Sequence, residues 1–193
     1  MVSDDLVIRL GDPGRDAAAV AEIYRSAVEF GVASFEEVAP DAAEMAGRMT
    51  TILSTTPWLV AELDGRVVGY AYAGPHHARP GYRWSVNVSV YVAPRRAGQG
   101  LGRRLYRELF AILGRQGFVN VYAGIALPND ASVALHRSMG MALVGTYRRV
   151  GFKFGAWHDV AWYSLRLTEP VGPPPPPIPL PELDRVLGGS IDP

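Results

Sequence analysis

Three glycines at alternate positions, Gly98, Gly100 and Gly102, form the part of the sequence best suited to bind an anion. They follow a segment of alternating polar and apolar residues, 85–92, and precede an amphipathic segment that runs on from about Arg103. Glycines let a ligand approach the main chain closely, and a helix N-terminus offers unpaired N–H groups and a favourable dipole. The arrangement therefore predicts a main-chain anion site; the alternative is a glycine-rich turn that binds nothing.

Two common phosphate-binding loops do not fit these glycines. A Walker loop requires a Lys followed by Ser or Thr after its last glycine, and neither pair follows here. A dinucleotide-binding loop requires G-x-G-x-x-G and an acidic residue about twenty positions further on. Here the glycines lie one residue too close together, and Tyr122 and Ala123 occupy the position of the acid.

The segment 74–83 is a second candidate, because it contains His76, His77, Arg79 and Arg83. It is too polar and too rich in turn-forming residues to be a strand. It joins a predicted hairpin to the predicted central strand, 85–92. These side chains could bind an acidic group, or the segment could be a solvated connection.

The candidate residues need a scaffold, and hydrophobic periodicity predicts one of mixed helices and strands. The hairpin around Asp64-Gly65 is the clearest signal, since this dipeptide suits a type I′ turn. We expect a helix capped by Asp16 and a long aromatic loop at 151–159. The predicted strands are 6–10, 58–63, 66–73, 85–92, 119–127, 141–150 and 160–167, and the predicted helices are 16–30, 41–53, one from about 103, and 132–139.

Composition limits the protein class. The chain has 193 residues, with 19 Lys plus Arg, 19 Asp plus Glu and no Cys. The balanced charge argues against nucleic-acid or membrane-surface binding, and the missing cysteines exclude disulfides and a thiol nucleophile. With no signal peptide and no apolar span, we expect a cytoplasmic protein without membrane contact.

A change in composition at residue 168 predicts two parts. Residues 1–167 would form one domain, and residues 168–193 a proline-rich tail that includes the run Pro173–Pro177. Polyproline supplies no backbone donors, so we expect a semi-rigid tail outside the core. An inert tail and a ligand for an SH3-type domain are the two interpretations.

Several blocks resemble the phosphinothricin N-acetyltransferases of the GNAT superfamily. The glycine loop is similar to the [RQ]-x-x-G-x-[GA] loop that binds the pyrophosphate of acetyl-coenzyme A (acetyl-CoA), with Ala97 at its first position. The other blocks lie in the same order across about residues 6–167. The blocks are Trp58–Glu62, Tyr72–Pro75, Val90–Val92, Gly100–Gly102, Leu127–Val133 and Gly151–Val160.

The resemblance implies the GNAT fold, an α/β (α+β) domain. Its twisted sheet would be mixed but mostly antiparallel, with about seven strands that splay at the centre and about four flanking helices. It also implies acetyl-CoA as co-substrate, no metal, a small-molecule amine as acceptor and a homodimer.

The same resemblance assigns roles to individual residues. His136 would protonate the departing thiolate, and a main-chain N–H around Val90 would meet the developing oxyanion. Asn129 would meet the pantetheine arm. The implied coenzyme-binding residues are Val90, Tyr91, Val92, Ala97, Gly98, Gln99, Gly100, Leu101, Gly102, Arg103, Asn129 and Ser132. The implied acceptor-binding residues are Phe35, His77, Arg79, Tyr82, Ser89 and Tyr91.

Asn87 departs from the family pattern, because the family has its general-base Glu at this position. A carboxamide accepts no proton at any useful pH. Deprotonating an α-amine at pH 7 costs roughly 3–4 kcal/mol, which a general base would otherwise help to supply. Water, Glu29, Glu36 or His136 could take the proton instead. If water does, kcat/KM should rise towards the pKa of the amine without a plateau.

Three functions are compatible with these residues. The first is acetyl transfer from acetyl-CoA to the α-amine of phosphinothricin, methionine sulfoximine or a similar amino acid. The second is acetyl transfer to a different small amine, which Asn87 and His77, the latter at the position of a lysine in the family, would favour. The third is non-catalytic binding of an acyl-CoA, for which the lost acid is the argument.

Overall fold

The structure is a computed structural model that describes residues 6–183 and 185. In this part of the chain, seven strands and four α-helices follow the order that the sequence predicts. None of the helices described has the length and apolar character that a bilayer span requires. The elements are β1 (Val7–Leu10), α1 (Pro13–Glu29), α2 (Ala42–Leu53), β2 (Trp58–Leu63), β3 (Arg66–Pro75), β4 (Ser85–Val92), α3 (Leu101–Gln116), β5 (Asn120–Ala126), α4 (Asp130–Ser138), β6 (Ala142–Lys153) and β7 (Ala156–Arg166).

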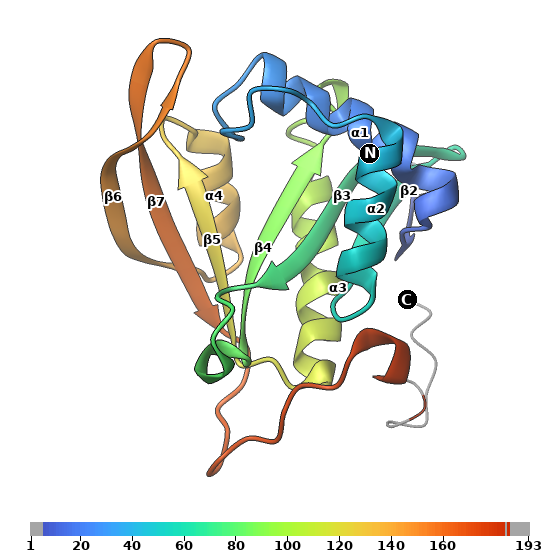
Figure 1. Ribbon diagram of the computed structural model, residues 1–193, viewed down its shortest axis with the longest axis vertical. Coiled ribbons are helices and arrows are strands. Elements are labelled where there is room, and N and C mark those ends of the chain that lie inside the picture. Colours follow the sequence, from blue (N-terminus) through green and yellow to red (C-terminus); the bar gives the residue numbers. More distant parts are fainter. Residues whose placement is uncertain (1–5, 184, 186–193) are drawn as a thin grey trace.

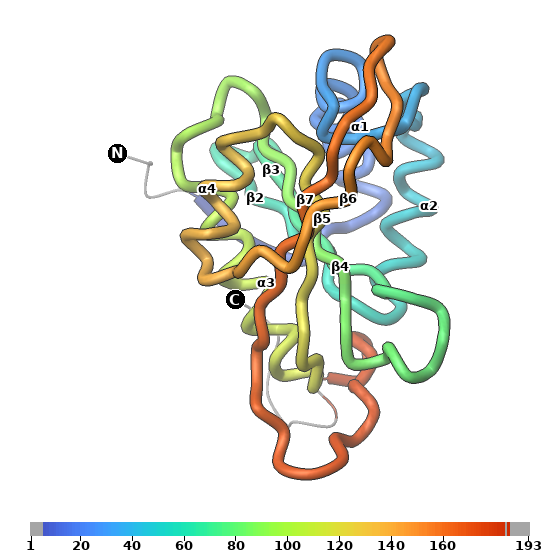
Figure 2. The backbone as a smooth tube through the Cα atoms, turned by 90° about the vertical axis from the view of Figure 1, so that its left-hand side faces the viewer, coloured from blue at the N-terminus to red at the C-terminus, as the bar shows by residue number. Residues whose placement is uncertain are grey.

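The strands form one mixed sheet in the order β1-β2-β3-β4-β5-β7-β6. Every neighbouring pair is antiparallel except β4 and β5, which are parallel. Helices α1 and α2 cover one face of the sheet, and α3 and α4 cover the other (Figures 1 and 2). This three-layer arrangement confirms the predicted fold class.

The sheet opens between β4 and β5. Strand β4 pairs with β5 only through Ser85, Val86 and Asn87, whereas its pairing with β3 continues to Val92. From Val88 onward the two strands diverge, as Figure 1 shows for the green and yellow arrows. The splay that the family resemblance implies therefore lies within the polar stripe of β4, the row of Ser85, Asn87, Ser89 and Tyr91 on one face of the strand.

Alternation of polar and apolar residues along β4 explains how α3 packs against the sheet. Val86 and Val88 are buried against the core that contains α3, while Ser85, Asn87 and Ser89 are only partly buried on the opposite face. Apolar residues at helical spacing bury one side of α3 in the same core. Those residues are Leu101, Leu105, Leu109, Ile112 and Leu113.

Two predicted boundaries are wrong. The first helix begins at Pro13 with Asp12 as its N-cap, and Asp16 is instead buried and bonded to Arg9. Most of the predicted loop 151–159 is strand, because β6 continues to Lys153 and β7 starts at Ala156. The chain reverses at Phe154 and Gly155, which both have positive φ, of 50° and 74°. The phenylalanine at a left-handed position concealed this turn from the sequence.

Part of the proline-rich segment packs on the domain, which differs from the tail expected outside the core. Leu180 and Leu183 belong to the buried core, with exposed fractions of 4% and 0%. Gln116 holds the segment by donating to the carbonyl of Ile178, and Trp84 donates to that of Pro175. The proline run thus carries two leucines back to the sheet domain. The domain boundary at residue 167 remains a prediction.

Candidate active site

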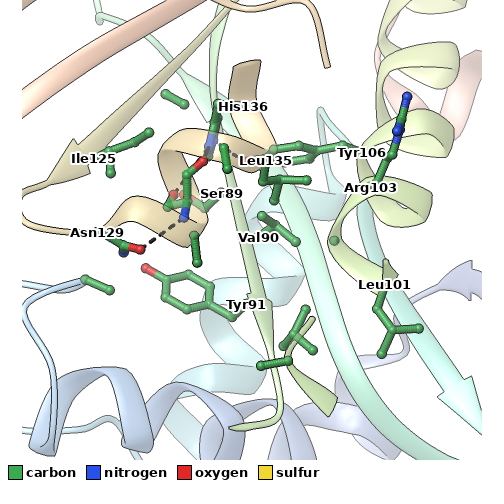
Figure 3. Close-up of a pocket in the computed structure, with 18 of the residues that line it drawn as sticks. Ser89, Val90, Tyr91, Leu101, Arg103, Tyr106, Ile125, Asn129, Leu135 and His136 are labelled. Carbon is green, nitrogen blue, oxygen red and sulfur yellow. Dashed lines mark hydrogen bonds between the residues drawn. The ribbon is translucent and has the colours of Figure 1, made fainter. Parts of the chain in front are cut away.

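A cavity of about 620 Å³ lies where β4 and β5 separate. Its walls come from β4, the glycine turn, the start of α3, β5 and α4 (Figure 3). All the predicted coenzyme-binding residues line it except Gln99, which is exposed. Arg96 and Tyr106 also line it and were not predicted.

The glycine turn presents free main-chain donors to this cavity. Gly98 and Gly100 adopt positive φ of 76° and 79°, and Gly100 caps α3 without any side-chain hydrogen bond. The first bond within this helix turn is donated by the N–H of Arg104, so the preceding N–H groups of the turn have no helical partner. Arg96 and Arg103 add positive charge beside them. The turn therefore suits a phosphate or pyrophosphate group.

Strand β4 supplies a second row of donors. Its odd-numbered residues direct their peptide groups at β3, as shown by the bonds at the carbonyl of Ser85 and the N–H of Ala93. The even-numbered residues must therefore point towards β5. Because pairing with β5 stops at Asn87, the N–H of Val90 faces the cavity side of the splay with no strand partner. This geometry suits the oxyanion role expected near Val90, and that role remains a prediction.

Helix α4 brings His136 and Asn129 to the same cavity. Asn129 is the N-cap and accepts the N–H of Ser132 at 3.1 Å. Tyr106 reaches from α3 towards His136, which is 4% exposed (Figure 3). The tyrosine oxygen lies 3.1 Å from His136 Nε2.

The protonation state of His136 follows from its contacts. Burial lowers the pKa of His136, partly opposed by its bond to Ser132, so the ring is neutral at pH 7. Its Nδ1 lies 2.7 Å from the carbonyl of Ser132 and must carry the proton, since a carbonyl only accepts. Nε2 then accepts from the hydroxyl of Tyr106. Both ring nitrogens are occupied, so His136 is not free to act as the base.

A second cavity of about 460 Å³ adjoins the first and shares Ser89, Tyr91 and Gly124 with it. Asn87 and Phe35 line this second cavity. Of the residues expected to bind the acceptor, it thus brings together Phe35, Ser89 and Tyr91. The two cavities meet at the polar stripe of β4, where the sheet opens.

The other three expected acceptor-binding residues lie on the neighbouring loop. His77, Arg79 and Tyr82 are exposed and do not line the second cavity. His77 packs on Tyr82 with 4.8 Å between ring centroids. His76 connects this loop to the cavity, because its Nδ1 lies 2.8 Å from Oδ1 of Asn87. No local pattern in the sequence predicts this contact.

Hydrogen bonds from a buried lysine hold the loop after α1, whose residues 33–35 line the second cavity. Lys153, the single lysine of the chain, is 7% exposed and donates to the carbonyls of Val28 at 2.6 Å and Ser34 at 2.7 Å. Burial lowers the pKa of Lys153, against the attraction of nearby Glu36. No pattern in the sequence predicts a role for Lys153.

Glu36 is engaged elsewhere. It accepts from Arg48 at 2.8 and 3.0 Å and from the hydroxyl of Tyr24 at 2.8 Å. The hydrogen bonds from Arg48 lower the pKa of Glu36, with burial acting in the opposite direction. Glu29 pairs with Arg25 at the exposed end of α1. Neither carboxylate lines the second cavity.

Comparison with known proteins identifies the family of the chain. A family model described as an acetyltransferase (GNAT) domain matches residues 13–162. The phosphinothricin N-acetyltransferase of Streptomyces viridochromogenes is 41% identical over 160 residues, which cover 83% of this chain and 87% of the relative. The L-methionine sulfoximine/L-methionine sulfone acetyltransferase of Salmonella typhimurium is 37% identical, covering 87% of this chain and 98% of the relative.

A solved structure agrees as well. The phosphinothricin acetyltransferase of Sinorhizobium meliloti, in complex with acetyl-CoA, superposes with a TM-score of 0.81 at 37% identity. The match covers 87% of this chain and 94% of that structure. The similarity thus extends over most of the chain. This chain belongs to the GNAT family of acetyltransferases and is an N-acetyltransferase.

Proposed function

We propose that the chain is a cytoplasmic enzyme that transfers the acetyl group of acetyl-CoA to the α-amine of a small amino acid of the phosphinothricin or methionine sulfoximine type. The observation that carries the proposal is the meeting of two cavities at Ser89, one lined by main-chain donors and the other by aromatic and polar side chains. The relatives named for these acceptors cover more than four fifths of the chain, which supports the acceptor class.

The first cavity fits acetyl-CoA. The unpaired N–H groups after Gly100 would bind the pyrophosphate, with Arg96 and Arg103 offsetting its charge. The even-numbered N–H groups of β4 and the side chain of Asn129 would hold the pantetheine arm. When bound, acetyl-CoA supplies the activated acetyl group.

The second cavity would hold the acceptor. Phe35, Ser89 and Tyr91 line it, and Arg79 and Tyr82 on the adjacent loop would bind the acidic end of the amino acid. A guanidinium suits a carboxylate or phosphinate because it offers two parallel donors.

The chemistry would be direct attack of the amine on the thioester, since the chain has no cysteine to form a covalent intermediate. The N–H of Val90 would stabilise the negative charge that develops on the thioester oxygen. To protonate the departing sulfur, His136 would take up a proton from solvent at Nε2 and give its Nδ1 proton to sulfur when its bond to Ser132 opens, which returns the ring to its neutral form. The variant His136→Phe keeps a ring against Tyr106. A lower kcat at unchanged coenzyme affinity would support His136 as the proton donor, and an unchanged kcat would exclude this role.

The experiment that tests the function is thiol release from acetyl-CoA over a panel of amines. The panel contains phosphinothricin, methionine sulfoximine, ordinary amino acids and simple amines, and a coenzyme-binding titration runs beside it. We expect turnover with the first two acceptors. Turnover with other amines only would support the different-acceptor alternative, which the carboxamide of Asn87 favours. Binding without turnover on any amine would contradict an enzyme.

We also propose a homodimer. Strand β6 is an edge of the sheet, and the hairpin that it forms with β7 exposes large apolar side chains. Phe152, Phe154 and Trp157 are 55%, 63% and 53% exposed. An apolar edge of this kind suits an isologous contact with a second copy. Sedimentation should give a dimer that Phe154→Asp weakens; a monomeric native chain would contradict the proposal.

A further inference from the structure

His76 is fixed at the junction of three strands. Its ring nitrogen Nδ1 lies 2.8 Å from Asn87 Oδ1, and its backbone N–H donates to the carbonyl of Ser85. The ring stacks on Tyr122 with centroids 4.4 Å apart and planes 20° apart. Strand pairing explains the meeting, because Asn87 lies opposite both Gly74 and Tyr122. His76 is therefore held in one orientation beside Asn87.

The contact with Asn87 determines the tautomer of the ring. A carboxamide oxygen only accepts a hydrogen bond, so Nδ1 of His76 must carry the hydrogen. In the neutral ring, Nε2 then has a free lone pair. Within the described residues, Nε2 makes no hydrogen bond. His76 thus combines a fixed ring with a vacant basic nitrogen, whereas both nitrogens of His136 are occupied.

The surroundings of the ring suit a proton acceptor. His77, with its centroid 4.4 Å away, and Tyr82, 5.9 Å away, face it from the loop, and Tyr122 faces it from β5. Trp162 of β7 lies 6.2 Å away and lines the second cavity, as Asn87 does. No carboxylate forms an ion pair with the ring in the part of the chain described. His76 therefore contacts two residues that line the acceptor cavity, Asn87 and Trp162.

We propose that His76 accepts the proton that the acceptor amine must lose, with Asn87 as the residue that positions it. The inference rests on the proposed acetyl transfer. One N–H bond of the ammonium breaks, and its proton moves to Nε2 of His76, directly or through one water. The freed lone pair bonds to the acetyl carbon, and the C–S bond breaks with its electron pair on sulfur. The second proton lost by nitrogen balances the one that sulfur takes up, and His76 releases its own proton to solvent.

This arrangement explains how the chain can function without a carboxylate at position 87. The carboxamide cannot take a proton, but its oxygen fixes the hydrogen on Nδ1 and leaves Nε2 as the base. Glu36 is bonded to Arg48 and Tyr24, and Glu29 to Arg25. The other ionisable groups considered for this role are thus engaged elsewhere.

The test is the pH dependence of kcat/KM for phosphinothricin or, failing that, for the best acceptor of the panel. The native profile should rise and then level off well below the pKa of the acceptor amine, because a base of the protein takes the proton in place of water. His76→Gln retains an amide donor for Asn87, and His76→Phe retains the ring stacked on Tyr122. Both should lose about 10- to 100-fold near pH 7 and then rise without a plateau, the lower part of a general-base contribution.

A second substitution that restores activity can show whether His76 acts as a base or only as a packing residue. Adding Asn87→Glu to His76→Gln places a carboxylate in the same wall and should restore most of the loss near pH 7. Asn87→Glu alone should gain little, because the native chain already has a base. His77→Ala should keep the plateau even if the acceptor KM rises, since His77 has no bond to Asn87. Unchanged acetyl-CoA affinity and melting temperature show that each variant is folded.

The contrary outcomes are distinct. A native profile that climbs to the pKa of the amine without a plateau would overturn the inference and favour water as the acceptor. A plateau that survives in His76→Gln would overturn it too. If the native chain acetylates no amine at all, the proposed function fails, and the role of His76 fails with it.

Discussion

The two halves of the site are built in opposite ways. The coenzyme half takes its donors from the main chain, at the turn around Gly100 and along β4. The acceptor half takes its groups from side chains such as Phe35, Asn87 and Trp162, which belong to three separate elements. Main-chain donors depend on backbone conformation alone, whereas the side-chain half depends on packing between elements. The first should tolerate changes of residue that keep the backbone conformation and the open space of the turn, and the second should change specificity with its side chains.

Distance along the chain shows the same contrast. The anion-binding turn spans only residues 97–103, followed at once by its helix. The acceptor half is held by contacts such as that of Lys153 with Ser34, which are 119 residues apart. Substitutions should therefore separate coenzyme affinity from acceptor recognition.

The largest expected effect is on the coenzyme half. Gly100→Val places a branched residue at φ of 79°, and its side chain would enter space free of protein atoms within 4 Å. We expect the dissociation constant of acetyl-CoA to rise about 100-fold, or ~2.7 kcal/mol. Calorimetry measures it, with Gly114→Ala on α3 as the matched control. Native affinity in a folded Gly100→Val variant would refute the main-chain site.

The acceptor half should respond to Arg79→Ala. Loss of the guanidinium should raise the KM of an acidic acceptor about tenfold, the size of one charge-assisted hydrogen bond. The affinity for acetyl-CoA should not change. Arg66→Ala, at the exposed start of β3, is the control. If the KM is the same in both variants, the loop 76–83 is only a connection.

A smaller effect is expected from Lys153→Met, which keeps the length of the side chain but removes both bonds to Val28 and Ser34. The loop after α1, which includes Ser34 and Phe35 of the acceptor cavity, would loosen while the glycine turn stays intact. We expect a several-fold higher acceptor KM, or about 1 kcal/mol, with unchanged coenzyme affinity. A loss of coenzyme affinity alone would contradict the division into halves.

The smallest effect concerns pH. The pKa of Glu36 is lower in the folded chain, so its pairing with Arg48 stabilises above the ordinary pKa of about 4.3 and is lost as pH falls through the folded value. The pair is partly exposed and should contribute about 1 kcal/mol or less. Glu36→Gln should therefore melt up to about 2–4 °C below the native chain at pH 7. The gap should close in acid; a gap independent of pH would exclude the ionic contact.

The contrast also explains what the sequence could predict. Glycine spacing, strand alternation and helical periodicity are local signals. They predicted an anion-binding turn at Gly98–Gly102, the strand 85–92 and a scaffold of mixed helices and strands, and the family resemblance added the GNAT fold. The residues of the acceptor cavity could be predicted only in part. Phe35, Ser89 and Tyr91 followed from family resemblance, and they do line the second cavity. Resemblance could not reveal what replaces a lost group, so the contact of His76 with Asn87 required the structure.

The errors have related physical causes. Composition alone placed Leu180 and Leu183 in an external tail, because it does not show that a proline run can return to the core. Asp16 looked like a helix cap by residue type, but Arg9 and burial recruited it into the interior. Here burial raises the pKa of Asp16, and the bonds from Arg9 more than offset this and lower it. In both places, contacts made in the folded domain overrode the local signal.

The most direct test of a main-chain coenzyme site is a titration of acetyl-CoA followed by backbone amide NMR. The N–H resonances of Val90, Val92 and the segment 98–103 should shift first and most. A competing cavity of about 470 Å³, lined by Trp58, Tyr70 and Tyr72, lies between α2 and the sheet. Shifts concentrated at that cavity, with the glycine turn unchanged, would contradict the account.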